Sequence, residues 1–298
     1  MASVQDLKRR VRSVKNTRKI TKAMELVASA RLRRAQTRIE AMRPYAETMR
    51  ELIAGVGRAS ASVRGLPLLQ QRDEVKTVAV VALTGDRGLA GPFNGQILRR
   101  SFALERQLRA EGLDVRWLVA GKKGRSTLTF RRYELDAAWT GFSDRPSYSD
   151  AQTIAHRLTE LYTGGELDRV IVVYNHFESP LVQRVVEQEV LPIAEDLFTE
   201  GDDDHRDDPA LAGDFIYEPE PEAILARLLP VYLETELYRA LLESAASEQG
   251  ARMTAMRNAT KNAGELVDRL TLEMNRARQA EITQEILEVV AGADALTQ

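Results

Sequence analysis

The two ends of this chain carry long apolar stripes that constrain its fold more than any other feature. From Met1 to Gly57, and again from Pro221 to about Ala291, apolar or small residues recur in steps that alternate between three and four. This spacing places one narrow stripe along an α-helix and is typical of helices that pair in a coiled coil. Because the first stripe continues in phase beyond Pro44, we expect this proline to kink the helix rather than end it.

Each stripe needs a partner, because a single amphipathic helix is marginal in water. Both stripes are long and narrow, which favours pairing of the two helices with each other over packing on a globular core. The first stripe consists of Val4, Leu7, Val11, Val14, Ala28, Ala35, Ile39, Met42, Ala46, Met49, Ile53 and Val56. The second consists of Leu242, Ala246, Gln249, Met253, Met256, Thr260, Ala263, Val267, Leu270, Met274 and Ala277.

The places where the two helices meet the middle of the chain predict how they pair. Both border the same central region, at Gly57 and Pro221, so they should run antiparallel, with position n near position 279 − n, to within about one turn. The first helix then ends opposite Arg278, and the second continues alone. A bare helix end with apolar side chains needs another protein to cover it. The apolar side chains of this end are Ile282, Ile286, Leu287, Val289, Val290 and Leu296.

The central region alternates between strand and helix patterns, which favours a parallel, doubly wound sheet. Strands are predicted at Val75–Leu83, Leu113–Ala120, Arg169–Tyr174 and Leu181–Val190, and helices at Asn94–Glu111 and Ala151–Thr163. The segment Glu200–Pro209 (EGDDDHRDDP) is too polar to pack and is predicted to be a solvated loop. The predicted fold is therefore α/β: a Rossmann-like domain inserted between two coiled-coil helices, divided into residues 1–57, 58–220 and 221–298.

Composition excludes several classes of protein. The chain has no cysteine, which excludes disulfides, thiolate catalysis and thiolate metal sites. Its three histidines, His156, His176 and His205, are scattered, so no metal site is expected. No run reaches the apolar length of a membrane span, and the basic N-terminus lacks the apolar core of a signal peptide. We expect a protein of a soluble compartment, attached to a membrane through partners at most.

A glycine-rich turn, LTGDRGLAGPF (Leu83–Phe93), follows a predicted strand and precedes a helix, as many phosphate-binding loops do. Its glycines do not form G-x-G-x-x-G, and the next strand ends in LVAGKKG without the carboxylate that would hold a ribose. The Gly-Lys-Ser/Thr of a P-loop is also absent. We therefore expect tight turns tied locally by Asp86 and Arg87, and no nucleotide or other cofactor.

The first helix is strongly basic between Lys8 and Arg38, where Glu25 is the single acid. Such a one-signed helix attracts an acidic partner: nucleic acid, anionic lipid or an acidic protein surface. A basic coiled coil that binds nucleic acid is therefore one alternative function, although the helix lacks interleaved aromatic residues and a reading motif. A dinucleotide-dependent enzyme is a second alternative, and the spacing of the glycines argues against it.

Four segments together resemble the γ subunit of F-type ATP synthases, over nearly the whole chain. They are KITKAMELVASARL (Lys19–Leu32), GDRGLAGPFN in the glycine turn, ALLESAASEQGARMTAMRNATKNA (Ala240–Ala263) and RQAEITQEILEVVAGADAL (Arg278–Leu296). The resemblance implies a rotor shaft with no catalytic site of its own, inside a hexamer of α and β subunits. Its α/β domain would lie against the ε subunit and the membrane c ring, on the cytoplasmic face of a bacterial cell membrane. Proton or sodium flow through the c ring would drive rotation, and neither nucleic acid nor a membrane span is implied.

The resemblance also implies contact residues. Contacts with loops of the catalytic subunits fall on Met24, Arg252, Arg278, Gln279 and Thr283. Contacts with the c ring fall on Phe215, Ile216, Tyr217 and Glu218. The basic first helix would face an acidic loop of β. This chain departs from the family by having Ala90 where a cysteine is frequent, and by lacking the cysteine insertion of chloroplast forms, which excludes thiol control.

Overall fold

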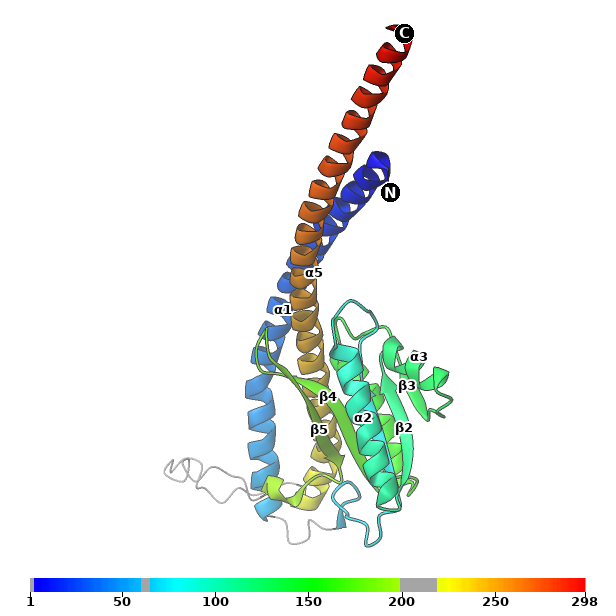
Figure 1. Cartoon of the computed structure of the whole chain (residues 1–298). Helices are drawn as coiled ribbons and strands as arrows, with labels where there is room; N and C mark the ends of the chain where they lie inside the picture. Colours follow the sequence, from blue (N-terminus) through cyan, green and yellow to red (C-terminus); the bar gives the residue numbers. More distant parts are fainter. Residues whose placement is uncertain (1–2, 60–64, 199–218, 298) are drawn as a thin grey trace. The chain divides into compact units, whose positions relative to one another are not determined.

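The computed structural model describes residues 3–59, 65–198 and 219–297 and divides into two compact units. We call Met1–Ser29 with Arg252–Gln298 the helix-pair unit, and Ala30–Ala251 the sheet unit. The elements, labelled in Figure 1, are α1 (Val4–Ala59), β1 (Thr77–Leu83), α2 (Phe93–Ala110), β2 (Asp114–Ala120), α3 (Lys122–Phe130), β3 (Ala137–Trp139), α4 (Tyr148–Thr163), β4 (Arg169–Phe177), β5 (Gln183–Leu191), the 3-10 helix η2 (Glu195–Phe198) and α5 (Pro221–Thr297).

Both predicted long helices are confirmed. The first helix, α1, continues through Pro44, and α5 extends six residues past the predicted end at Ala291. The division into residues 1–57, 58–220 and 221–298 stays a prediction about functional parts.

The sheet has five strands in the order β3-β2-β1-β4-β5 (Figure 1). Strands β1, β2 and β4 are parallel, as predicted, and β3 is parallel to β2. The register places Val81 of β1 beside Leu118 of β2 and Val172 of β4. The last strand, β5, runs antiparallel to β4, which corrects the prediction of a parallel sheet at this edge. Only residues 178–182 join β4 to β5, and a parallel neighbour needs a much longer crossover.

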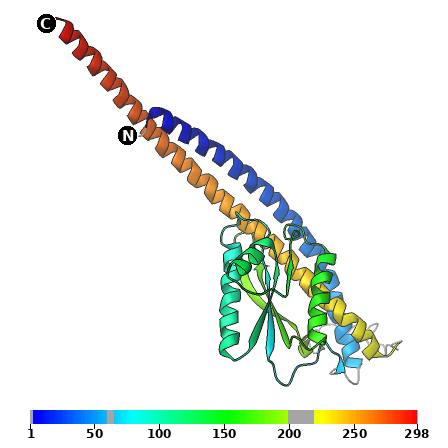
Figure 2. The same ribbon diagram turned by 90° about the vertical axis from the view of Figure 1, so that its right-hand side faces the viewer.

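Alternating residues of β1 build two separate cores, as the two-residue repeat of a strand requires. Val78, Val80 and Ala82 pack with α2 and α3 on one face. Ala79, Val81 and Leu83 pack on the other face with α4 and with the parts of α1 and α5 that belong to the sheet unit. The sheet is therefore the middle of three layers, and both of its faces are covered (Figure 2).

Within the sheet unit the two long helices pack on the sheet, which corrects the expectation that their stripes meet each other throughout. The apolar face of the sheet opposite α2 would otherwise be exposed, and parallel sheets are covered on both faces. The residues that cover it, besides those of α4, are Met49, Ile53 and Val56 of α1 and Leu225, Leu229, Leu233, Leu237 and Leu241 of α5.

In the helix-pair unit the expected antiparallel seam is present. Its apolar core consists of Leu7, Val11, Val14, Val267, Leu270, Met274 and Ala277. Thr21 contacts Thr260, and Glu25 contacts Arg257, so facing positions add to 281 or 282. This register differs from the predicted value of 279 by less than one helical turn.

The sequence patterns did not predict α3 and β3. The nine residues of α3, KKGRSTLTF, include a glycine and two threonines, which favour helix weakly, and a single leucine that reaches the core. As described below, side chains of the glycine turn hold the first turn of α3 in place. The three-residue β3 pairs with β2 alone, and such a short edge strand leaves little periodicity to recognise.

Candidate functional site

The end of α5 is an apolar surface that its own unit does not cover. The seam places the start of α1 opposite residues 277–278, and α5 continues past the N-terminus of α1 (Figure 2). Every residue from Gln279 to Ala291 is exposed, including apolar side chains that are 47% to 72% accessible. These side chains are Ile282, Ile286, Leu287, Val289 and Val290. The predicted bare end of the helix is therefore confirmed for residues 279–291, and the side chain of Leu296 lies outside the part that the structure describes.

The paired part of the same unit also exposes apolar and basic side chains. Ile20, Leu26 and Val27 of α1 are each more than half exposed. The basic residues Arg10, Arg12, Lys15, Arg18 and Lys19 are exposed, and none has an ion pair among the residues that the structure describes. Exposed apolar and positively charged patches on a helix pair indicate a surface that binds other proteins with acidic groups, rather than one that stays in contact with water.

The middle of the seam is polar; the stripe analysis included Thr260 of α5 but missed the polar residues that α1 contributes. Thr21 and Glu25 are buried between the helices. The Thr21 and Thr260 hydroxyl oxygens are 2.8 Å apart, and the Glu25 carboxylate accepts from Lys22 at 3.1 Å and from Arg257 at 3.2 Å. Burial alone would raise the pKa of Glu25, but the two cations outweigh it and lower that pKa. Continuing the alternation of three and four from Val14 leads to both residues, so spacing without regard to polarity finds them.

The five residues predicted to contact catalytic subunits all belong to the helix-pair unit. Arg278 and Gln279 are exposed, and the exposed Thr283 donates its hydroxyl hydrogen to the Gln279 carbonyl at 2.9 Å. Met24 is half-buried, and Arg252 is only 7% exposed, which makes it the least accessible of the five. Contact of these residues with another subunit stays a prediction. The predicted c-ring residues Phe215, Ile216, Tyr217 and Glu218, and the loop Glu200–Pro209, lie outside the described residues.

Side chains of the glycine turn hydrogen-bond to the two segments that follow the carboxyl ends of β2 and β3. Thr84 is buried, and its hydroxyl donates to the Ala120 carbonyl at 2.8 Å and accepts from the Gly124 amide at 2.9 Å. Asp86 accepts amide hydrogens from Lys122 at 2.9 Å, Gly141 at 2.9 Å and Ser143 at 3.1 Å. Because Lys122 begins α3, the carboxylate of Asp86 lies where a phosphate would lie at a helix N-terminus.

These contacts explain why the turn resembles a nucleotide site. Burial would raise the pKa of Asp86, but the amides of Gly141, Ser143 and Lys122 outweigh it and lower that pKa below its ordinary value of 3.8. The anion at this helix end is thus supplied by the chain itself. Arg87 pairs with Asp144 at 3.3 Å, as a local tie. Absence of nucleotide binding stays a prediction, which calorimetry with ATP and NAD tests.

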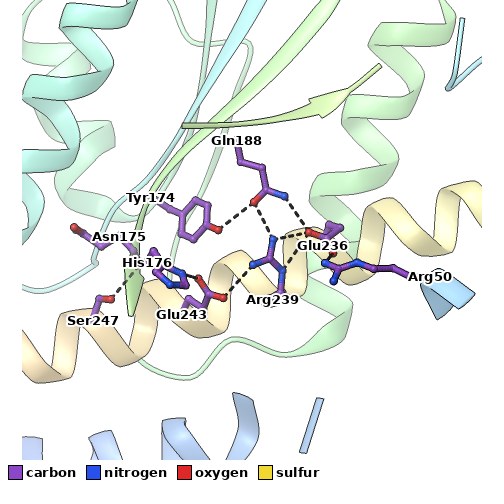
Figure 3. Close-up of polar contacts among 9 residues, drawn as sticks. All are labelled: Arg50, Tyr174, Asn175, His176, Gln188, Glu236, Arg239, Glu243 and Ser247. Atoms are coloured by element: carbon purple, nitrogen blue, oxygen red, sulfur yellow. Dashed lines mark hydrogen bonds and ion pairs between the residues drawn. The ribbon is translucent and has the colours of Figure 1, made fainter. Parts of the chain in front are cut away.

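A buried network of charges attaches α5 to the sheet, and sequence reasoning missed it (Figure 3). Arg239 lies at its centre and bonds Glu236 at 2.6 Å and Glu243 at 3.1 Å. Gln188 of β5 accepts from Arg239 at 3.1 Å and donates to Glu236 at 2.9 Å. Further contacts come from Arg50 to Glu236 at 2.9 Å, from His176 to Glu243 at 2.6 Å and from Tyr174 to Gln188 at 3.1 Å.

The two carboxylates of the network are deeply buried, since Glu236 and Glu243 are 4% and 6% exposed. The side chains of Arg239, His176 and Arg50, by contrast, are 26%, 41% and 47% exposed. Burial would raise the pKa of Glu236, but Arg239, Gln188 and Arg50 outweigh it and lower that pKa. Burial also raises the pKa of Tyr174 to about 12, so its hydroxyl stays a donor to Gln188. Three charged residues at spacings of three and four within an apolar stretch, LETELYRALLE, were the available sequence signal.

Two kinds of site are not found in the part of the chain that the structure describes. No group of three histidine or acidic side chains lies close enough to hold a metal ion. No described helix has a stretch long and apolar enough to cross a membrane.

Comparison with known proteins agrees with this geometry. A family model described as ATP synthase matches residues 3–296. The ATP synthase gamma chain of Rubrobacter xylanophilus is 48% identical over 99% of both chains. That of Moorella thermoacetica is 47% identical over 99% of this chain and 100% of the relative.

Solved structures give the same result. A chain of the central stalk and c ring of Tetrahymena thermophila mitochondrial ATP synthase is 29% identical, covering 80% of this chain and 99% of that chain, with a TM-score of 0.58. A chain of Euglena gracilis mitochondrial ATP synthase, at 18% identity, shares the fold with a TM-score of 0.69 over 98% of this chain and 94% of that one. The chain therefore belongs to the family of ATP synthase gamma chains.

Proposed function

We propose that this chain is the central rotor shaft of an ATP synthase and couples rotation of a membrane ring to conformational change at catalytic sites on other subunits. It is a non-catalytic component of that enzyme. Its partners are the α and β subunits, the ε subunit and the c ring. The observation that carries the proposal is the exposed apolar end of α5, which a free protein would not present to water.

The features of the helix-pair unit suit a shaft inside a ring of subunits. An antiparallel pair of different helices has no rotational symmetry, so three chemically equal catalytic sites around it meet three different faces. A ligand or neighbour shifts a conformational equilibrium only by its differential contacts with the states. Turning the shaft changes which site meets which face, and in this way mechanical rotation changes nucleotide affinity at each site.

Torque has to pass from the sheet unit into the helices. Helix α5 is continuous from Pro221 to Thr297 and belongs to both units. In the sheet unit it is held by the leucines of the sheet core and by the network around Arg239. Apolar packing resists separation, whereas hydrogen bonds with fixed partners also resist sliding and turning of the helix. The network therefore suits a rigid junction between helix and sheet.

The nucleic-acid alternative has no support among the relatives, which are gamma chains of ATP synthases. The basic face of α1 instead suits an acidic loop of β. The chain belongs to a membrane-associated complex, and we place it on the cytoplasmic face of a bacterial membrane. Contact of Met24, Arg252, Arg278, Gln279 and Thr283 with catalytic subunits, and of residues 215–218 with the c ring, are parts of this proposal.

A single-molecule experiment tests the proposal directly. The natural chain has no cysteine, so Arg125→Cys on the exposed side of α3 gives one labelling site. A catalytic hexamer assembled with this variant is fixed to glass through its β subunits, and a gold particle is attached to the cysteine. Addition of ATP should turn the particle in one direction. Hydrolysis of ATP by labelled complexes whose particles only fluctuate would contradict the rotor function.

A further inference from the structure

The seam of the helix-pair unit contains a layer of polar side chains near its middle. We call Thr21 and Glu25 of α1, with Arg257 and Thr260 of α5, the polar layer. All four residues belong to the helix-pair unit. Thr21 and Glu25 are buried, and burial of a polar side chain costs stability unless the side chain has partners. The partners of these two residues therefore indicate what the layer contributes.

The two threonines join the helices through a chain of hydroxyl groups. Their hydroxyl oxygens are 2.8 Å apart. The Thr21 oxygen also lies 3.1 Å from the Arg18 carbonyl oxygen, and the Thr260 oxygen lies 2.8 Å from the Met256 carbonyl oxygen. A hydroxyl has a single hydrogen, so one threonine donates to the other, which donates to a carbonyl of its own helix. In either direction the chain ends on the backbone, and this fixes both side chains.

Glu25 makes a second connection across the seam, one turn after Thr21. Its carboxylate accepts from Arg257 of the other helix at 3.2 Å and from Lys22 of its own helix at 3.1 Å. The side chain of Glu25 is 10% exposed, whereas those of Arg257 and Lys22 are 57% and 55% exposed. Two cations at the rim thus hold the carboxylate inside the seam.

The apolar layers of the seam hold the helices together without fixing their axial position. The register of Thr21 and Thr260 places Val14 opposite Val267. A shift of one heptad would place Val14 opposite Met274, which is again apolar against apolar. The same shift would place Thr21 opposite Val267 and break the hydroxyl chain. Apolar contact has no direction, whereas a hydrogen bond requires a narrow range of distance and angle. The polar layer is therefore the part of the seam that specifies one axial position.

Torsion of a helix pair makes its helices slide past each other, because winding or unwinding the pair changes the path of each helix. We propose that the polar layer resists this sliding and so sets the torsional stiffness of the shaft. The proposal rests on the shaft function proposed above and makes the four residues positioning residues for coupling. Packed helices shift by about 1–2 Å relative to each other, whereas an O–H···O bond allows a range of only about 0.5 Å.

Two pairs of substitutions separate the hydrogen bond from packing. Thr21→Val with Thr260→Val keeps the shape of both side chains and removes the hydroxyls. Thr21→Ser with Thr260→Ser keeps the hydroxyls and removes the methyl groups. Replacing both partners of a hydrogen bond by apolar groups of the same shape is nearly neutral or stabilising, so in hydrogen exchange of the full chain the valine pair should protect the amides of the seam at least as well as the natural residues do. The serine pair should protect them less, because it loses buried methyl groups.

Torsional stiffness is measured on single assembled complexes. Arg125, which is exposed on α3, is replaced by p-azidophenylalanine to attach a gold particle without cysteine, and the catalytic hexamer is fixed to glass through its β subunits. The variance of the particle angle is recorded while the complex is stalled without ATP. The valine pair should raise this variance at least about 1.5-fold, because the sliding range at the layer grows from about 0.5 Å to about 1–2 Å. The serine pair should keep the natural variance. Stability and stiffness then change in opposite directions, which a merely structural role does not produce.

The ion pair provides an independent measurement, also if the valine pair does not assemble. Arg257→Met removes the cation that reaches Glu25 from the other helix, and it should raise the angular variance as well. The matched control is Arg269→Met. Arg269 is exposed on the same helix and has no ion pair among the described residues, so the angular variance should stay at the natural value.

Two results would overturn the proposal. The first is an angular variance equal to the natural value in complexes that carry the valine pair or Arg257→Met and still rotate on addition of ATP. The second is a serine pair that fluctuates as much as the valine pair, which would assign the stiffness to methyl packing. Natural complexes that hydrolyse ATP without rotating would instead contradict the shaft function itself, and the proposal with it, so the two failures are distinguishable.

Discussion

Replacing Arg239 by methionine removes the charge at the centre of the buried network and keeps most of the stem. Arg239 is the cation that joins Glu236 and Glu243, whose side chains are 5% and 7% exposed. Removing one partner of a buried ion pair costs about 3–5 kcal/mol. Without Arg239, the basic side chains left beside these carboxylates in the described part of the chain are the more exposed Arg50 for Glu236 and His176 for Glu243. This is a large part of the roughly 5–15 kcal/mol that stabilises a domain.

The loss can be measured in the full chain by urea unfolding at pH 7. The two tryptophans, Trp117 and Trp139, belong to β2 and β3, so their fluorescence reports on the sheet unit. With a slope of about 2 kcal/mol per molar urea, a loss of 4 kcal/mol lowers the midpoint by about 2 M. The matched control is Arg100→Met. Arg100 pairs with Glu187 on the same sheet but is 52% exposed, so its loss should stay below about 1 kcal/mol.

The pH dependence distinguishes lost charge from lost packing. The pKa of Glu236 in the folded protein is below its ordinary value of 4.5, so its stabilising contribution is complete above pH 4.5 and disappears as pH falls through the folded pKa. Without Arg239 the folded pKa of Glu236 should rise, so the variant takes up a proton at higher pH. The difference in free energy of unfolding between the natural chain and the variant should therefore shrink as the pH falls from 7 to 4.5. A loss below 1 kcal/mol, or one that is equal at both pH values, would refute this account of the network.

Three further predictions concern the helix pair and the glycine turn. Arg278→Ala should leave assembly intact but change ATPase turnover about tenfold. The loss of one charged hydrogen bond, worth roughly 1.5–3 kcal/mol, in a single rotary state alters the free-energy differences between the rotary states. Turnover equal to that of the natural complex would show that Arg278 is not one of the contacts. Thr21→Cys combined with Thr260→Cys should form a disulfide on oxidation, since the two hydroxyl oxygens are 2.8 Å apart. The control pair, Thr21→Cys with Asn262→Cys, should not form one, and a disulfide in the control pair alone would disprove the register. Gly121→Ala should destabilise the sheet unit by more than the roughly 1–3 kcal/mol that a side chain at its positive φ of 101° costs, because the new Cβ would also clash with the Thr84 carbonyl. The control is Gly141→Ala, which has a φ of 104° and open space around the new Cβ, and equal losses of stability in the two variants would exclude the clash.

Part of this structure follows from residue patterns that are local in sequence. The alternation of three and four fixes both long helices, because an amphipathic helix presents its apolar face at those spacings whatever its partner is. The apolar runs at residues 75–83 and 113–120 likewise predict β1 and β2, since buried strands need apolar residues on both faces. The bare end of α5 follows from simple counting, because the predicted C-terminal helix, residues 221–291, is longer than the predicted N-terminal helix, residues 1–57.

Other features depend on residues that are distant in the chain. A stripe of spacing three and four packs equally well on a helix or on a sheet, so the sequence did not predict that Met49–Val56 and Leu225–Leu241 cover the sheet. Helix α3 depends on Thr84 and Asp86, which lie in another loop, and its own residues favour helix only weakly. The register of the pair was predicted to within one turn, and only the contacts of Thr21 and Glu25 fixed it.

The sequence by itself determined the two long helices, the central strands β1, β2 and β4 and, through family motifs, the function, because each depends on periodicity or on residues close together along the chain. Tertiary structure decided which charges share a buried network and which carboxylate occupies the phosphate-like position at α3. Both depend on segments that fold brings together: Gln188 and Arg239 are on different elements, as are Asp86 and Lys122. Electrostatic partners act over a few ångströms in space, and no periodicity along the chain encodes them.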